Sequence, residues 1–266
     1  MRCALSIAGS DPTGGAGLQL DVQVFRLHGV HGAGVPTALT VQDTRSVHSV
    51  LPTFPSVMLD QLRVLLADLA FQAIKVGMLA SDDVARAVAL ALEGLRPRPP
   101  LVLDPVFAAS DGTVLLERRA RPILESLIEG CALVTPNLEE AAQLTGEDTS
   151  DEAGVRRAAQ RLISDFGAGA ALVKGGHRDG PSDDLLALRS ASGIRCLELP
   201  GSRIDAPSLH GTGCALSAAI AARLARGEAL EDAIEGARSF LRHAIARAVG
   251  RGENEPRLLD FGDASL

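Results

Sequence analysis

Residues 209–227 read LHGTGCALSAAIAARLARG, a glycine turn that runs into a long alanine-rich segment. Gly211 and Gly213 allow the backbone to turn tightly and to expose its N–H groups, and the alanine-rich run is a strong helix former. Such a turn can bind an anion, because free N–H groups and the positive end of the helix dipole point the same way. Cys214 falls in the first turn, where its thiol is polarised toward the thiolate. The stretch alone fits an ordinary buried helix start with a structural cysteine equally well.

The composition excludes several classes of protein. The chain has 266 residues, 46% of them hydrophobic, which suits one large α/β domain or two small ones. A net charge of −7, seven Phe and no Trp or Tyr argue against nucleic acid or an anionic membrane as the main partner. The four cysteines are scattered without a CxxC pair, which predicts a reducing, cytoplasmic location rather than a zinc site or disulfide scaffold. No run of about 18 apolar residues is present, so no transmembrane helix is expected.

Apolar strand-like segments alternate with helical segments along the chain. Strands are predicted at residues 3–8, 34–41, 73–79, 101–106, 132–135 and 170–173, with a hairpin formed by 185–188 and 194–199. Helices are predicted at 18–27, 56–70, 82–95 (capped by Ser81), 118–128, 151–166 and 230–249. The alternation predicts one doubly wound α/β domain over residues 1–250, followed by a loosely held polar tail over 251–266.

Two features near strand ends are candidates for ligand binding. The glycine-rich loop 9–17 follows the first strand; it contains Asp11, and Asp21 lies one turn into the following helix. The loop matches neither GxGxxG nor a P-loop. It therefore either faces a ligand or allows the strand and helix to pack closely. Asp104 ends a strand that is otherwise apolar, and a buried carboxylate is costly unless it is paired, hydrogen-bonded or bound to a metal. Ligands of parallel sheets bind at that end of the strands, which favours a functional role for Asp104.

Three further polar residues allow two interpretations each. Gln42 follows a predicted strand and can both donate and accept hydrogen bonds, although an ordinary loop glutamine is the simpler interpretation. Asn137 and Glu140 stand three residues apart at a helix start. They either share one face of the helix or cap it and complement its dipole.

Seven collinear segments, spread over residues 3 to about 249, resemble one family. They are AGSDPTGGAGLQLD (8–21), TALTVQDT (37–44), KVGML (75–79), LDPV (103–106), TPNLEEAAQLTG (135–146), VKGGH (173–177) and HGTGCALSAAIAARLARG (210–227). Together they resemble the hydroxymethylpyrimidine/phosphomethylpyrimidine kinases of thiamine synthesis, within the ribokinase-like superfamily. The resemblance implies a three-layer α/β fold with a central, mostly parallel sheet and helices on both faces.

The resemblance also implies the reaction and the site. It implies ATP and Mg²⁺, transfer of the γ-phosphoryl group to the hydroxymethyl oxygen of 4-amino-5-hydroxymethyl-2-methylpyrimidine, often a second transfer to the monophosphate, and a homodimer. The pyrimidine site would comprise Gly9, Asp21, Gln42, Met78 and Val106. The anion hole would comprise Gly211, Thr212, Gly213 and Cys214, with Cys214 as the candidate base. Asn137 and Lys174 would bind the nucleotide, and Asp104 and Glu140 would face the metal, Glu140 through water.

The chain departs from the family pattern where the family carries cations. Ser110 and Pro207 stand where lysine or arginine is usual, Leu209 replaces a threonine, and residues 251–254 lack the usual glycine-rich segment. The departures predict weaker phosphate binding, above all for the second transfer, unless another cation compensates; candidates are Lys174, Arg178 and Arg203. Two alternatives therefore stand beside the pyrimidine kinase: a pyridoxal/pyridoxine kinase, which Gln42 disfavours, and a catalytically weak pyrimidine-binding homologue.

Overall fold

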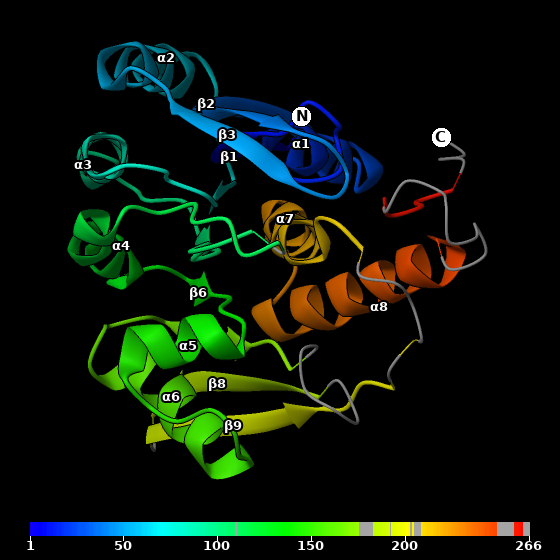
Figure 1. Cartoon of the computed structure of the whole chain (residues 1–266). Coiled ribbons are helices and arrows are strands. Elements are labelled where there is room, and N and C mark those ends of the chain that lie inside the picture. Colours follow the sequence, from blue (N-terminus) through cyan, green and yellow to red (C-terminus); the bar gives the residue numbers. More distant parts are fainter. Residues whose placement is uncertain are drawn as a thin grey trace.

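The strands form one sheet with helices on both faces (Figure 1). The structure is a computed structural model and describes residues 1–109, 111–175, 183–191, 193–202, 204, 209–248 and 258–262. Within these residues the strands lie in the order β3-β2-β1-β4-β5-β6-β7-β8-β9. Neighbours from β2 to β7 pair in parallel, and β3, β8 and β9 pair antiparallel at the two edges. The predicted three-layer α/β fold with a mostly parallel sheet is confirmed.

The strands are β1 (Cys3–Ser10), β2 (His31–Gln42), β3 (Val47–Pro52), β4 (Ala73–Val76), β5 (Leu101–Leu103), β6 (Leu133–Val134), β7 (Ala170–Val173), β8 (Asp184–Ser190) and β9 (Gly193–Leu199). The helices are α1 (Gly17–Leu27), α2 (Pro55–Asp68), α3 (Asp82–Glu93), α4 (Arg121–Ile128), α5 (Leu138–Thr145), α6 (Glu152–Ser164), α7 (Thr212–Ala225) and α8 (Leu230–Ala248), with a 3₁₀ turn at Arg118–Ala120.

Two hydrophobic cores lie on opposite faces of the sheet. Leu5 and Ile7 of β1 enter the core beneath α2 to α6, whereas Ala4 enters the core beneath α1, α7 and α8. This division follows from the alternation of side chains along a strand. The alanine-rich α7 is buried between α1, α8 and the sheet, and its small side chains allow all three to approach closely (Figure 1). The buried helix places its N-terminal turn at the carboxyl ends of the central strands.

Most predicted elements are confirmed within a few residues. The Ser81 cap is present, since its Oγ accepts from the Val84 N–H at 3.4 Å. The hairpin of β8 and β9 is also confirmed. The β3 strand was not predicted, because it is an edge strand whose side chains are mostly exposed and therefore lack an apolar pattern. The strands β4 and β5 end three residues before their predicted limits, because the chain turns there into loops that line a cavity.

The prediction of a loosely held tail is wrong for residues 258–262. Leu259 is buried in the core beneath α8, and the ring of Phe261 stacks on Phe240 at a centroid distance of 5.3 Å. These apolar side chains dock the segment on α8. The rest of the predicted tail, 251–257 and 263–266, lies outside the described residues.

Candidate active site

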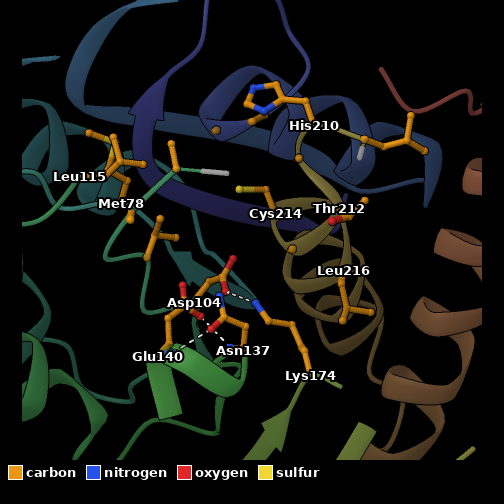
Figure 2. Close-up of a pocket in the computed structure, with 18 of the residues that line it drawn as sticks. Met78, Asp104, Leu115, Asn137, Glu140, Lys174, His210, Thr212, Cys214 and Leu216 are labelled. Carbon is orange, nitrogen blue, oxygen red and sulfur yellow. Dashed lines mark hydrogen bonds and ion pairs between the residues drawn. The ribbon is translucent and has the colours of Figure 1, made fainter. Parts of the chain in front are cut away.

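A cavity of about 990 Å³ lies at the carboxyl ends of the parallel strands (Figure 2). Its wall contains every site residue predicted from the sequence except Asp21. These residues come from the last residues of β1 and β2, from segments that follow β4, β5, β6 and β7, and from the first turn of α7. Segments up to about two hundred residues apart therefore meet in one site, because parallel strands bring their carboxyl ends to a single edge of the sheet.

The first turn of α7 faces this cavity without a side-chain cap. Its N-cap residue is Gly211, which has φ +78°, and a Cβ at this position would lie 1.9 Å from the carbonyl oxygen of Gly15. Only glycine fits there, since the two glycine segments touch backbone to backbone. The N–H groups that begin a helix have no partner within it. Those of Thr212, Gly213 and Cys214 can therefore bind an anion in the cavity.

Lys174 adds a positive charge beside this turn. A Cβ on Gly213 would lie 3.2 Å from Lys174 Nζ, so the ammonium group is next to the anion hole. Lys174 Nζ also donates to Asp104 Oδ1 at 3.0 Å. Burial lowers the pKa of Lys174, but the charges of Asp104 and Glu140 outweigh it and the net pKa is raised. The lysine is therefore protonated at neutral pH and lies beside the first turn of α7.

Asp104 is held by several donors in the cavity wall. Its Oδ1 accepts from Thr135 Oγ1 at 3.1 Å as well as from Lys174, and its Oδ2 accepts from Ser217 Oγ at 3.1 Å. Burial raises the pKa of Asp104, but the positive charges of Lys174 and Lys75 have the larger effect. The net pKa is therefore lowered, and the carboxylate is ionised. The expected cost of a buried carboxylate is offset by an ion pair and two hydroxyl donors.

Glu140 and Asn137 form a capping box at the start of α5. Asn137 Oδ1 accepts from the Glu140 N–H at 2.8 Å, and Glu140 Oε2 accepts from the Asn137 N–H at 2.7 Å. The capping interpretation that the sequence left open is thus confirmed. Both residues also line the cavity. Burial raises the pKa of Glu140 to about 7, the nearby Asp104 adds to this, and Lys174 opposes it.

The carboxylates partly satisfy the needs of a divalent cation. Among the described residues, no three His, Cys, Asp or Glu side chains form a metal-binding group. Glu140 uses one oxygen in the capping box, and no hydrogen bond is described for the other. Mg²⁺ in kinases is commonly bound through one or two carboxylates together with substrate phosphates and water. A buried carboxylate with a raised pKa beside Asp104 fits such a cation.

Cys214 differs from the expectation of a thiolate. Its pKa is raised, because burial and the charges of Asp104 and Asp21 outweigh the effects of Lys75 and the Gly17 N–H. The sequence expectation considered the helix dipole, whereas burial and the carboxylates of Asp104 and Asp21 also act on the thiol in the folded protein. In the resting protein Cys214 is a neutral thiol, and Figure 2 shows it pointing into the cavity.

The cavity wall across from the first turn of α7 consists largely of small and apolar residues. A Cβ on Gly9 would lie 2.7 Å from the sulfur of Met78, so the glycine makes room for the thioether. Thr37 Oγ1 donates to the Met78 carbonyl at 2.5 Å and fixes this loop. Val106 and Gln42 complete the wall. A flat ring with polar edges fits between the soft sulfur and the amide.

Asp21 lies behind this wall rather than in it. Its carboxylate accepts from Lys75 Nζ at 2.7 and 2.9 Å and from Ser6 Oγ at 2.5 Å, and neither charged side chain is exposed to solvent. Burial lowers the pKa of Lys75, but Asp21 reverses the effect and the net pKa is raised. Burial acts on Asp21 by raising its pKa, and the Lys75 ammonium opposes this. We take the pair as ionised because the lysine donates two short hydrogen bonds.

Lys75 itself lines the cavity, a position that the sequence reasoning missed. The signal was present, since a lone lysine in the apolar segment AIKVGML needs a buried partner. Thr135 and Ser217 were missed as well, because a hydroxyl in a helix or strand carries no comparable signal. Ser110, Pro207, Arg178 and Arg203 lie outside the described residues, as do 251–254.

Comparison with known proteins gives this site a family. The model of the phosphomethylpyrimidine kinase family matches residues 11–257. The chain belongs to this family. It is 41% identical to a hydroxymethylpyrimidine/phosphomethylpyrimidine kinase of Rhizobium meliloti, covering 94% of each chain, and 39% identical to that of Escherichia coli, again covering 94% of each. Its predicted family, and with it a kinase function, is confirmed.

Solved structures agree on the fold. The phosphomethylpyrimidine kinase of Clostridium difficile is 30% identical with a TM-score of 0.79, covering 92% of this chain and all of its own. The pyridoxal kinase of Bacillus subtilis, solved as an ADP complex, is 28% identical with a TM-score of 0.85, covering 98% of this chain and 96% of its own. Members of the fold thus include kinases named for two different ring substrates. None of the described helices has the length and apolar character needed to cross a bilayer.

Proposed function

We propose that the chain is an ATP-dependent kinase of thiamine biosynthesis that phosphorylates the hydroxymethyl group of 4-amino-5-hydroxymethyl-2-methylpyrimidine. One observation carries the proposal: the uncapped turn of α7, with Lys174 beside it, faces the same cavity as Gln42, Met78 and Val106. A site for a flat polar ring and a site for an anion therefore share one enclosed space. Relatives that bear this activity in their names are up to 41% identical along almost the whole chain.

Each group has a part in the reaction. Gln42 presents an amide to the ring nitrogen and amine of the pyrimidine, and Met78 covers the ring. The N–H groups of Thr212 to Cys214, together with Lys174, neutralise charge on the transferred phosphoryl group. Phosphoryl transfer has a loose transition state and needs positioning more than a strong base. The neutral thiol of Cys214 therefore orients the substrate hydroxyl, and the hydroxyl proton passes to an oxygen of the transferred phosphoryl group as the new P–O bond forms and the bond to ADP breaks.

Asp104, Glu140 and Asn137 occupy the nucleotide side of the cavity. A Mg²⁺ ion bound through Glu140, directly or through water, would offset the charge of the triphosphate. Asp104 fixes the ammonium of Lys174 beside the anion hole. The Asn137 side-chain oxygen caps α5, which leaves its amide group free to face the nucleotide. Asp21 acts in this scheme by holding Lys75 rather than by touching the ring.

Lys174 lies close to the proposed anion hole, and its charge supports at least the first phosphorylation despite Ser110 and Pro207. A pyridoxal kinase remains the second candidate, because the Bacillus subtilis pyridoxal kinase shares the fold with a TM-score of 0.85. Gln42 favours the pyrimidine.

We further propose a single kinase domain over residues 1–250, a homodimer and a cytoplasmic location. Exposed Leu39 and Leu51, paired across β2 and β3, offer apolar surface for the dimer.

A substrate comparison tests the function. The purified protein is incubated with Mg-ATP and, separately, hydroxymethylpyrimidine, its monophosphate and pyridoxal, and products are identified by mass spectrometry. Phosphorylation of hydroxymethylpyrimidine is expected, and phosphorylation of pyridoxal alone would overturn the proposal. Binding of the pyrimidine without turnover of any substrate would support the weakly active homologue instead.

Two variants test the roles assigned in the cavity. Gln42→Ala is expected to raise the KM for the pyrimidine far more than that for ATP, because it removes the amide that reads the ring. Cys214→Ala is expected to lower kcat strongly with the fold retained. Equal changes in both KM values, or a near-normal kcat, would remove the respective residue from its role.

A further inference from the structure

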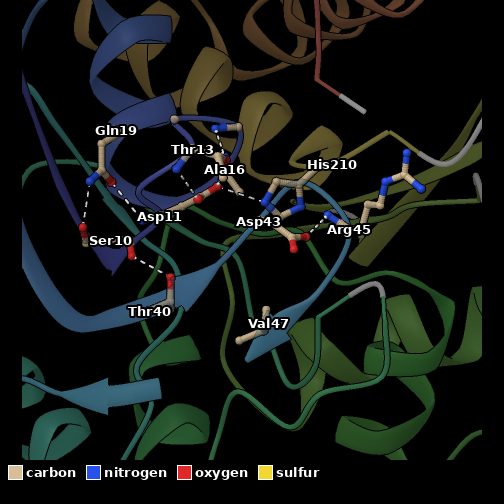
Figure 3. Close-up of polar contacts among 12 residues, drawn as sticks. Ser10, Asp11, Thr13, Ala16, Gln19, Thr40, Asp43, Arg45, Val47 and His210 are labelled. Carbon is tan, nitrogen blue, oxygen red and sulfur yellow. Dashed lines mark hydrogen bonds and ion pairs between the residues drawn. The ribbon is translucent and has the colours of Figure 1, made fainter. Parts of the chain in front are cut away.

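Asp11 lies where three parts of the site meet, and the reaction scheme above gives it no role. It is buried in the loop between β1 and α1. Its Oδ1 accepts from the Thr13 N–H at 2.8 Å, and its Oδ2 accepts from Thr13 Oγ1 at 2.9 Å and from the Ala16 N–H at 2.8 Å (Figure 3). The hydrogen bonds to this one carboxylate thus hold the glycine-rich loop in its conformation.

Two more contacts connect Asp11 to distant segments. His210 Nε2 lies 2.9 Å from Asp11 Oδ2, across 199 positions of sequence, and the Gln42 side chain is close enough to lower the pKa of the carboxylate through hydrogen bonding. His210 directly precedes Gly211, the N-cap of α7. The carboxylate therefore interacts with the proposed ring-binding residue and with the residue that immediately precedes the anion hole.

The backbone geometry makes this connection stiff. A Cβ on Gly15 would lie 3.0 Å from His210 Cδ2, and a Cβ on Gly211 would lie 1.9 Å from the Gly15 carbonyl oxygen. The two glycine segments therefore touch directly beside the hydrogen bond between His210 and Asp11. The side chains of Leu258 and Leu20 also pack against these glycines, and the hydrogen bond between Asp11 and His210 adds a directional contact to this packing.

The histidine donates this hydrogen bond in either of its charge states. Burial raises the pKa of Asp11, but the hydrogen bonds from His210, Gln42 and Thr13 lower it further, to about 2. The carboxylate is thus ionised at neutral pH and can only accept, so Nε2 of His210 must carry a hydrogen. A neutral donor of similar reach would make the same contact.

We propose that Asp11 and His210 are positioning residues that hold the anion hole of α7 in register with the ring-binding residue Gln42. The inference rests on the proposed kinase function and assigns the pair a task within it. In this proposal His210 positions only the anion hole, whereas Asp11 positions both the anion hole and Gln42. A displacement of about 1 Å between reacting groups can cost on the order of 100-fold in rate.

Kinetics of matched variants test the pair. His210→Ala is expected to lower kcat about 10- to 100-fold with the pyrimidine KM changed less than about threefold. His210→Gln, whose amide can reach Asp11, is expected to restore kcat to within about threefold of the unsubstituted protein. Asp11→Asn, which replaces an acceptor by a donor, is expected to lower kcat and raise the pyrimidine KM. His28→Ala is the control, since His28 is a buried histidine outside the cavity.

A second measurement does not depend on the substrate. The rate of alkylation of the Cys214 thiol by iodoacetamide is followed by peptide mass spectrometry. The Gly17 N–H, at the end of the glycine-rich loop, donates to Cys214, so His210→Ala, which loosens the loop, is expected to weaken this contact and speed alkylation severalfold, and His210→Gln is not. If the unsubstituted protein does not phosphorylate the pyrimidine, the proposed function fails and the alkylation comparison alone decides on the pair.

Three results would overturn the inference. A normal kcat and alkylation rate in His210→Ala would show that the pair holds nothing in place. A His210→Gln variant as slow as His210→Ala would show that the imidazole itself is needed. An equal loss in His28→Ala would reduce both effects to general destabilisation, which melting temperatures of all variants measure in parallel.

Discussion

Two aspartate–lysine pairs lie at the cavity, one in its wall and one with its aspartate behind the wall, and their surroundings differ. Lys75 and Asp21 are both fully buried, and the lysine donates to both carboxylate oxygens at 2.7 and 2.9 Å. Lys174 donates to one oxygen of Asp104 at 3.0 Å, and 15% of its side chain is exposed. In the first pair, the charged groups of Lys75 and Asp21 hydrogen-bond to each other and are shielded from solvent. The second leaves donors of Lys174 directed toward the anion hole, so it can serve a ligand.

The difference shows that pairing alone does not define function. A buried pair is strongly destabilised when one partner is lost, because the other charge stays uncompensated. A pair at the cavity surface loses less stability, since water can replace the missing partner. We therefore expect variants of Lys75 to report on folding and variants of Lys174 to report on catalysis.

Lys75→Met is expected to have the largest effect. It leaves the carboxylate of Asp21 buried without its cation, which costs about 3–5 kcal/mol of stability and lowers Tm by roughly 10 °C. The double variant Asp21→Asn/Lys75→Met, a neutral pair of similar size, is expected to recover most of this loss. Differential scanning fluorimetry measures all three proteins. An unchanged Tm in Lys75→Met would show that the pair is not a closed structural unit.

Lys174→Met is expected to affect the reaction more than the fold. Loss of a cation beside the developing phosphoryl charge should lower kcat about 100-fold, with a smaller fall in Tm than in Lys75→Met. Lys174→Arg retains the charge and serves as the matched control. Steady-state kinetics with Mg-ATP separates kcat from KM. If the Met and Arg variants have equal activity, the charge of Lys174 does not contribute.

The sequence predicted most of the site because its chemistry follows from strand ends. Asp104 comes directly after an apolar strand, and parallel strands bring such positions to one edge, whereas the assignment of Asn137 and Lys174 to the nucleotide came from the family resemblance. The glycine turn before α7 was identifiable for the same kind of reason, since glycines ahead of an alanine-rich run predict a helix start. A local pattern and one topological rule thus located Asp104 and the helix start, and the resemblance to a family supplied the roles of the other site residues.

Contacts between distant residues could not be predicted in this way. Asp21 was assigned to the pyrimidine site, yet its carboxylate points to Lys75, a partner 54 residues away. The contact between Asp11 and His210 spans 199 residues and depends on how two glycine segments touch. The protonation of Cys214 depends on burial and on charges from several elements. Such properties arise from packing, which no local pattern encodes.

Glu140→Gln is expected to change stability in a pH-dependent manner. The pKa of Glu140 is raised to about 7 in the folded protein, chiefly by burial, from an ordinary value of 4.5. The folded state therefore binds this proton more tightly than the unfolded state, and stability falls as pH rises from about 4.5 to about 7. Glutamine keeps the oxygen that accepts from Asn137 and does not ionise.

Melting temperatures measured with EDTA at pH 5 and pH 8 check this prediction. Glu140→Gln should melt several degrees above the unsubstituted protein at pH 8 and within one or two degrees of it at pH 5. Glu139→Gln, on the exposed side of the same turn, is the control and should show no such difference. A constant offset at both pH values would contradict the raised pKa. Activity should fall in Glu140→Gln, because the cation would lose a charged ligand.

The smallest expected effects separate the two pairs most directly. Ser6 Oγ donates to Asp21 at 2.5 Å, and Ser217 Oγ donates to Asp104 at 3.1 Å, so each aspartate has one serine donor. Ser6→Ala and Ser217→Ala should each cost about 1 kcal/mol of stability. Only Ser217→Ala should also lower kcat, by about threefold, because Asp104 holds Lys174 beside the phosphoryl group and its displacement moves the cation. If Ser6→Ala lowers kcat equally, the buried pair also takes part in the reaction.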